Sequence, residues 1–190
     1  MKIDTQNESA HAEEHPAYLI AQAAVKRWVS DIARETGTPR WITLYGASGC
    51  GKTTLAMRAK NALEAKDKKA AFRSFKKLFD DFITSDDKTY FIDRRFRLPH
   101  VLIIDDLWLA QNASDRRQCA VEEMLYYLFE ERIAKPVMHI PHKWMLITTN
   151  MSPDAIAANI SERIADRLYR DGNEVIDMSA APSYNRPSKP

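Results

Sequence analysis

The stretch from Gly46 to Thr53 combines glycines, a lysine and a hydroxyl at the spacing of a phosphate-binding loop, G-x-x-x-x-G-K-[ST]. Its glycines let the backbone approach a ligand closely, so that successive N–H groups can point at the phosphates of a nucleotide. Lys52 adds a positive charge for the outer phosphates, and the hydroxyl of Thr53 can bind Mg²⁺. The sequence therefore predicts a nucleoside triphosphate site formed by Gly46, Ala47, Ser48, Gly49, Cys50, Gly51, Lys52, Thr53 and Thr54.

Two adjacent carboxylates, Asp105 and Asp106, follow the apolar run from Val101 to Ile104. Such a run is typical of a strand that is buried on both faces of a parallel sheet. Ligands of open α/β sheets bind at the carboxyl edge, where these side chains emerge. Asp105 is thus a candidate to hold Mg²⁺ together with Thr53, and Asp106 is a candidate to orient an attacking water.

Asn150 ends a second apolar run, at 144–149. A polar side chain at the tip of a strand beside the loop strand can sense the γ-phosphate and position water. We therefore predict a sensor role for Asn150, although as an isolated turn residue it would mean little.

Arg163 and Arg167 lie four residues apart and so share one face of a predicted helix. They can pair with the neighbouring acids Glu162 and Asp166. Alternatively, one of them can cross a subunit interface as an arginine finger and stabilise charge on the γ-phosphate of a neighbour. The pattern alone leaves these two interpretations even.

A third group of residues could bind single-stranded nucleic acid. Arg94, Arg95 and Arg97 are interleaved with Phe96, and Phe91 lies close by. Aromatic rings can stack on bases while arginines follow the phosphates. Ion pairing with the local aspartates is the competing interpretation for each arginine.

Alternating helices and strands must position these side chains. Apolar periodicity predicts helices at 17–34, 52–65, 75–84, 114 or 115 to 133 and, in parts, 153–169, and strands at 41–45, 70–73, 101–106, 144–150 and 174–178. Residues 85–99 contain few structural signals. We expect a flexible arm at 1–16, one core at 17–181 and a loose tail at 182–190.

Composition excludes several classes of protein. The 190 residues suit one domain, and a net charge of +2 means that nucleic acid must be bound through local patches. Two cysteines are too few for a disulfide framework, which favours a reducing cytoplasm. No signal peptide and no apolar run long enough for a membrane span is evident.

In their order, these pieces resemble the AAA+ ATPases and, within them, the DnaC/IstB group of helicase loaders and transposition ATPases. The likeness runs from about residue 17 to 185 and rests on 46–53, Leu102–Leu107, Ile147–Asn150, and Ser161–Leu168 followed by Ser183 and Tyr184. It implies an α/β P-loop NTPase fold of three αβα layers, with a five-stranded parallel sheet of order 5-1-4-3-2. It also implies ATP and Mg²⁺ as cofactors and self-association into an open ring or spiral.

The resemblance assigns roles to particular residues. It places the arginine finger on Arg167, with Arg163 as the second candidate. The finger would act in trans, on ATP held by the adjacent subunit, whose catalytic residues are Lys52, Asp106 and Asn150. Many relatives have Glu where this chain has Asp106, so we expect slow hydrolysis. Fewer residues precede the first strand than in DnaC-type loaders, whose N-terminal domain grips the helicase, and we expect no C-terminal helical lid.

The favoured function is an ATPase of bacterial or phage DNA replication that loads the replicative helicase onto single-stranded DNA. The alternative is an IstB-like transposition helper that binds duplex DNA and a transposase. A P-loop small-molecule kinase could use Arg94, Arg95 and Arg97 in a lid, but the tandem aspartates and Asn150 argue against it. An adaptor that binds ATP and hardly hydrolyses it is the fourth interpretation.

Overall fold

A computed structural model of the protein describes residues 15–36, 40–108, 115–133, 143–170 and 172–183. Its helices are α2 (Pro16–Arg34), α3 (Lys52–Glu64), α4 (Phe75–Thr84), α5 (Lys88–Ile92), the π-helix η1 (Asp93–Arg97), α6 (Asp115–Ile133), α7 (Pro153–Asn159) and α8 (Glu162–Arg167). Its strands are β1 (Trp41–Tyr45), β2 (Ala70–Ser74), β3 (Val101–Leu107), β4 (Trp144–Thr149) and β5 (Glu174–Asp177).

The five strands form one parallel sheet in the order β2-β3-β4-β1-β5, which confirms the predicted order 5-1-4-3-2. β1, which precedes the phosphate-binding loop, lies between β4 and β5, so that Thr43 is level with Ile147 on one side and Val175 on the other. All six residues of β4 are buried. Because every strand points the same way, the ends of β1, β3 and β4 meet at one edge of the sheet.

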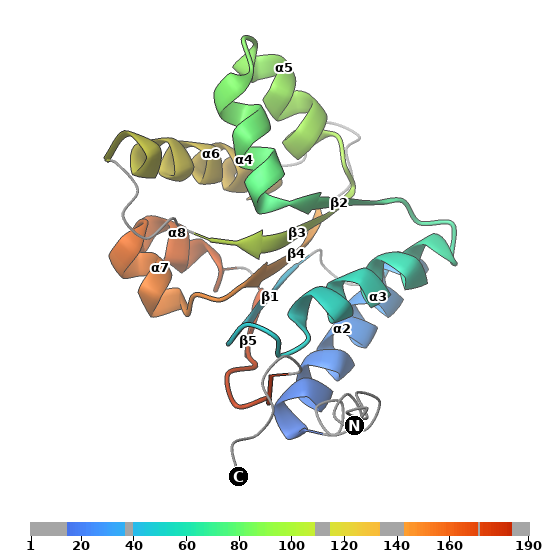
Figure 1. Ribbon diagram of the computed structural model, residues 1–190. Coiled ribbons are helices and arrows are strands. Elements are labelled where there is room, and N and C mark those ends of the chain that lie inside the picture. Colours follow the sequence, from blue (N-terminus) through green and yellow to red (C-terminus); the bar gives the residue numbers. More distant parts are fainter. Residues whose placement is uncertain (1–14, 37–39, 109–114, 134–142, 171, 184–190) are drawn as a thin grey trace, which may run out of the picture.

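Helices cover both faces of this sheet, as Figure 1 shows. Alternate residues of β3 separate the two layers: Val101 and Ile103 pack with α2 and α3, whereas Leu102 and Ile104 pack with α4, α6 and α8. This alternation follows from the period of two along a strand. It explains why β3 reads as a continuous apolar run rather than an alternating one.

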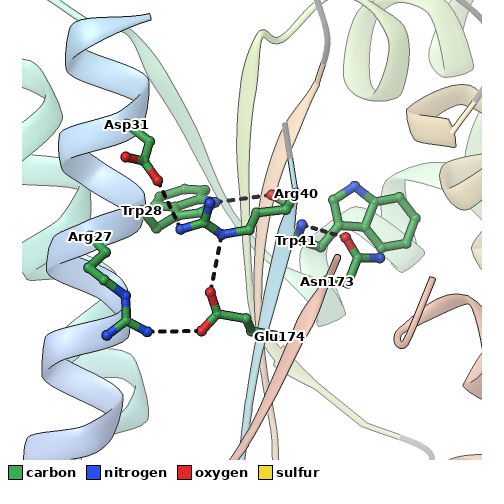
Figure 2. A network of polar contacts seen from close by, with 7 residues as sticks. All are labelled: Arg27, Trp28, Asp31, Arg40, Trp41, Asn173 and Glu174. Atoms are coloured by element: carbon green, nitrogen blue, oxygen red, sulfur yellow. Dashed lines mark hydrogen bonds and ion pairs between the residues drawn. The ribbon is translucent and has the colours of Figure 1, made fainter. Parts of the chain in front are cut away.

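Helix α2 is fixed at its start and along its length. His15 caps it by accepting a hydrogen bond from the N–H of Ala17 through Nδ1 (3.2 Å), and Pro16 occupies the first turn. Arg40, just before β1, forms ion pairs with Asp31 of α2 (2.9 Å) and Glu174 of β5 (3.2 Å), as Figure 2 shows. The helix is therefore tied to the beginning of the loop strand, at the edge opposite the loop.

The segment 85–99, which gave few signals in the sequence, contains α5 and η1. Phe91 and Phe96 lie in the core, and their rings are 5.6 Å apart, edge to face. The interpretation that these two rings stack on bases is therefore wrong, because both side chains are buried.

The predicted arm and tail lie almost wholly outside the described residues, as do Ser114, Tyr184 and Asn185. The domain boundaries therefore stay a prediction. Within the described part of the chain, no helix combines the length and apolar character needed to cross a bilayer.

Candidate functional site

The phosphate-binding loop connects β1 to α3 at the carboxyl edge of the sheet. Gly49 and Gly51 have φ values of 85° and 92°, which side chains rarely adopt, and Gly51 directly precedes the first residue of α3. The start of the loop is also crowded: a Cβ atom on Gly46 would lie 2.7 Å from the carbonyl carbon of Met178. The loop thus takes its shape from glycine conformations and from contact with the segment after β5.

Lys52 lies at the centre of the loop. Its side chain is buried, and its Nζ donates to the carbonyl oxygens of Gly46 and Ala47 and to Oδ1 of Asn150, each at 2.8 Å. All three acceptors are neutral. Because no carboxylate neutralises Lys52 among the described residues, its full charge is available to an anion in the loop.

Asn150 and Lys52 are therefore brought together, although 98 residues separate them in the chain. Asn150 is exposed at the end of β4, where the sequence placed it. Its amide oxygen accepts from Lys52, and its amide nitrogen can donate to a phosphate oxygen or a water.

Thr53 and Asp105 also meet at this edge. The Thr53 hydroxyl donates to Oδ1 of Asp105 at 2.9 Å, which joins the first turn of α3 to the end of β3. A hydroxyl and a carboxylate oxygen side by side are a donor set that suits Mg²⁺, which takes few protein ligands together with phosphate oxygens and waters. In the described residues no group of three or more His, Cys, Asp or Glu could hold a metal.

Asp106 occupies a special backbone position. It has a φ of 58°, the pairing of β3 with β4 shifts register between Ile104 and Leu107, and its side chain is exposed. The shift turns Asp106 out of the ladder, so that its carboxylate faces solvent at the site edge.

Thr148 is a site residue that the sequence analysis missed. Its hydroxyl donates to Oδ1 of Asp105 (2.7 Å) and accepts from the backbone N–H of Asp106 (2.8 Å). From the neighbouring strand it therefore contacts the carboxylate of Asp105 and the backbone of Asp106. The available signal was a polar residue inside the apolar run of β4, two positions before Asn150.

The remaining loop residues differ in exposure. Ala47, Ser48, Thr53 and Thr54 are exposed at the mouth of the loop. Cys50 is fully buried, and its Sγ lies 3.6 Å from Nζ of Lys52. The roles assigned to all these residues toward a nucleotide stay predictions.

The two arginines of α8 lie in different surroundings. Arg163 is exposed, whereas Arg167 is buried and forms an ion pair with Glu130 of α6. Both guanidinium groups lie over the ring of Tyr126, at 4.8 and 5.0 Å from its centroid. The sequence suggested Glu162 or Asp166 as the partner of Arg167, but its ion-pair partner in the structure is Glu130.

A separate cavity of about 600 Å³ lies beside α4 and α5, lined by Asp81, Thr84, Ser85, Tyr90, Phe91, Arg94 and Arg95. Tyr90 is the exposed aromatic ring here, with the guanidinium of Arg94 5.4 Å from its centroid. Arg97 points elsewhere, because it forms ion pairs with Asp93 and Glu131. Of the three predicted arginines, only Arg94 and Arg95 thus line the cavity.

The family of the domain follows from its sequence over residues 42–171. The profile of the ATPase family associated with various cellular activities (AAA) matches residues 42–171, which is more than half of the chain. The chain belongs to the AAA ATPase family. The matched region of this AAA domain contains the phosphate-binding loop, both aspartates, Asn150 and the two arginines of α8.

Solved structures confirm the fold of this AAA domain. It is similar to the DnaC helicase loader (TM-score 0.66, 22% identity, 86% of this chain and 91% of that chain). It is also similar to DnaI (TM-score 0.62, 20% identity, 90% and 86%) and to domain III of DnaA from Thermotoga maritima (TM-score 0.65, 18% identity, 86% and 62%). The AAA domain thus spans less than two thirds of that DnaA structure. No curated protein sequence matches the chain significantly.

Proposed function

We propose that the protein is a Mg²⁺-dependent ATPase that works as an oligomer. The observation that carries this proposal is the contact between Thr53 and Asp105, which joins the phosphate-binding loop to the end of β3. At the same edge of the sheet, Lys52 contacts Asn150. In the proposed site, Lys52 and the loop N–H groups hold the phosphates, and Thr53 with Asp105 holds Mg²⁺. Bound Mg²⁺ would neutralise charge on the phosphates.

Two further residues act on the attacking water in this proposal. The exposed carboxylate of Asp106 accepts a hydrogen bond from the water, and Asn150 orients the water and the γ-phosphate. Phosphate release should be Mg²⁺-dependent and should fall to background in Lys52→Ala. A phosphorylated small-molecule acceptor in the products would instead favour the kinase.

In the oligomer, Arg167 acts on the ATP of the adjacent subunit, with Arg163 as the second candidate. Arg167→Ala should lower cooperative turnover by roughly ten- to hundredfold, because charge on the γ-phosphate is no longer stabilised. Mixing Arg167→Ala with Lys52→Ala chains should restore part of the turnover, since each variant supplies what the other lacks. If Arg163→Ala abolishes turnover and Arg167→Ala does not, the finger is Arg163.

The cellular role that we propose is loading of the replicative helicase in the cytoplasm of a bacterial or phage-infected cell. The similarity in fold to the DnaC helicase loader and DnaI supports this proposal. Co-purification with the host replicative helicase, with and without ATP, tests it, and Lys52→Ala is the control for nucleotide dependence. ATP-dependent assembly on duplex DNA without helicase contact would favour the transposition helper instead.

Single-stranded DNA is the second proposed partner. Arg94 and Arg95 can contact phosphates, and the exposed ring of Tyr90 can stack on a base. The double variant Arg94→Ala/Arg95→Ala should weaken binding and reduce its salt dependence. The matched control, Lys26→Ala/Arg34→Ala, removes the same charge from α2 in the other helical layer and should leave binding unchanged.

A further inference from the structure

Arg167 is held inside its own chain. Only 3% of its side chain is exposed, and its partner Glu130 is 42% exposed. Its guanidinium also contacts the ring of Tyr126. A side chain in this position cannot reach another molecule until it leaves Glu130 and Tyr126.

The backbone of Arg167 is fixed as well. Asn173 donates from Nδ2 to the carbonyl oxygen of Arg167 (3.1 Å) and accepts through Oδ1 from the N–H of Trp41 (2.7 Å), the contact drawn in Figure 2. The ring of Trp41 packs in turn on Phe129, the neighbour of Glu130, at 5.0 Å. The end of α8 is thus tied to the beginning of β1, so rotation of the Arg167 side chain is the change of partner that leaves these contacts intact.

In its buried position Arg167 uses only part of its hydrogen-bonding capacity. Nη2 pairs with Glu130, but Nε and Nη1 are buried and have no hydrogen-bond partner in the part of the chain that the structure describes. Unsatisfied buried donors lower the stability of a position. The guanidinium of Arg163 over the same ring adds like-charge repulsion. Glu130 is therefore the main group that keeps Arg167 in place.

We infer that Glu130 is a positioning residue that holds Arg167 in the single chain and yields it to the phosphate of a neighbouring subunit's ATP on assembly. This inference rests on the proposed function, in which Arg167 acts in trans. An anion replaces an anion in the exchange, so the guanidinium is never left without a counter-charge. The strength of the Glu130 pair then sets the protein concentration at which ATP turnover becomes cooperative.

The test measures ATP turnover per chain against protein concentration for wild type, Glu130→Gln, Glu130→Asp and Arg167→Ala. Glu130→Gln should lower the concentration of half-maximal turnover by about three- to tenfold, because Arg167 no longer has to break a charged hydrogen bond. Glu130→Asp keeps the charge with a shorter reach and should give an intermediate shift. Glu123→Gln is the matched control, an exposed acid on the same helix, and should match wild type.

Two measurements separate this role from a loss of stability. ATP affinity measured below the assembly concentration should be the same in Glu130→Gln and wild type, since Glu130 is outside the loop. In the Arg167→Ala background, Glu130→Gln should no longer change the protein concentration of half-maximal turnover, so the double variant should behave like Arg167→Ala alone. An unchanged or higher midpoint in Glu130→Gln, with cooperativity lost in Arg167→Ala, overturns the positioning role and leaves the proposed function standing. Cooperative turnover in Arg167→Ala overturns the trans role itself.

Discussion

The single hydroxyl of Thr148 contacts both aspartates at the end of β3. By donating to Asp105 and accepting from the N–H of Asp106, it fixes the side chain of one and the backbone of the other. A residue of this kind is invisible to motif analysis, because its role depends on which strand lies beside β3. The sequence alone predicted the place of Asp105 and Asp106 near the end of β3, since a carboxylate after a buried strand is a local signal.

We expect Thr148→Val to lower ATP turnover about tenfold and the free energy of unfolding by about 1–2 kcal/mol, because Val has the same shape and lacks the hydroxyl. Turnover assays and urea unfolding measure the two effects. Thr43→Val on β1 is the control. Its hydroxyl is buried without a hydrogen-bond partner among the described residues, so this change should raise stability by about 1 kcal/mol. Equal behaviour of the two variants would contradict the role of Thr148.

The strands and the long helices were predicted to within a few residues, whereas α5 and η1 were not. The reason lies in their spacing: Phe91 and Phe96 are five residues apart, which matches the i to i+5 bonding of a π-helix rather than a period of 3.6. The bond from the N–H of Leu98 to the carbonyl of Asp93 (2.9 Å) follows this pattern. Their burial then depends on α6, which no local pattern reveals.

Two substitutions of Asp106, at the end of β3, can measure its effect on stability apart from its effect on ATP turnover. Asparagine and aspartate tolerate a positive φ, whereas β-branched residues do not. Asp106→Asn should therefore keep the wild-type melting temperature and lower ATP turnover at least tenfold. Asp106→Val should in addition lower the free energy of unfolding by about 1–2 kcal/mol. Turnover close to wild type in Asp106→Asn would remove this carboxylate from the mechanism.

Helix α6 is joined to η1 by a bidentate pair. Arg97 donates from Nε and Nη2 to the two carboxylate oxygens of Glu131, at 2.7 and 2.9 Å. These hydrogen bonds lower the pKa of Glu131 below its ordinary value of 4.5. The folded state therefore binds fewer protons than the unfolded state, so the stabilisation is complete above pH 4.5 and is lost as the pH falls through the lowered pKa.

Arg97→Gln should accordingly reduce the free energy of unfolding by about 1 kcal/mol at neutral pH and by much less at about pH 3. Urea unfolding at both pH values measures the difference. Lys77→Gln, which breaks the exposed 3.4 Å pair with Asp81, is the control and should have little effect at either pH. A loss that is independent of pH would show that Arg97 stabilises the fold by packing alone.

At the scale of the whole molecule, the phosphate-binding loop depends on the segment after β5. The Cβ of an alanine at Gly46 would lie 2.7 Å from the carbonyl carbon of Met178 and 2.8 Å from the nitrogen of Ser179. Movement of these backbone atoms would also disturb the hydrogen bond that the N–H of Met178 donates to the carbonyl of Tyr45 at the end of β1 (2.7 Å). The motif explains this glycine by the close approach of the loop to a ligand. The structure adds a second reason, the close approach of the backbone of Met178 and Ser179.

Gly46→Ala should lower the free energy of unfolding by about 2 kcal/mol or more and weaken ATP binding, because the loop and the segment after β5 must move apart. Gly172→Ala isolates the contribution of the clash. It also has a positive φ, 78°, but its added Cβ would meet nothing within 4 Å, so the cost is conformational, about 1 kcal/mol. Thermal melts and ATP titrations compare the two, and equal losses would show that the contact with Met178 carries no energy.

The position of β1 in the sheet also has a consequence for how the domain folds during its synthesis. The strand is made early, yet its neighbours are residues 144–149 on one side and 174–177 on the other. A nascent chain that has emerged only as far as α6 therefore contains the whole phosphate-binding loop without the strands that flank β1. Asn150, the partner of Lys52, is also still missing at that stage. The order of the strands thus delays a competent nucleotide site until nearly the entire domain has left the ribosome.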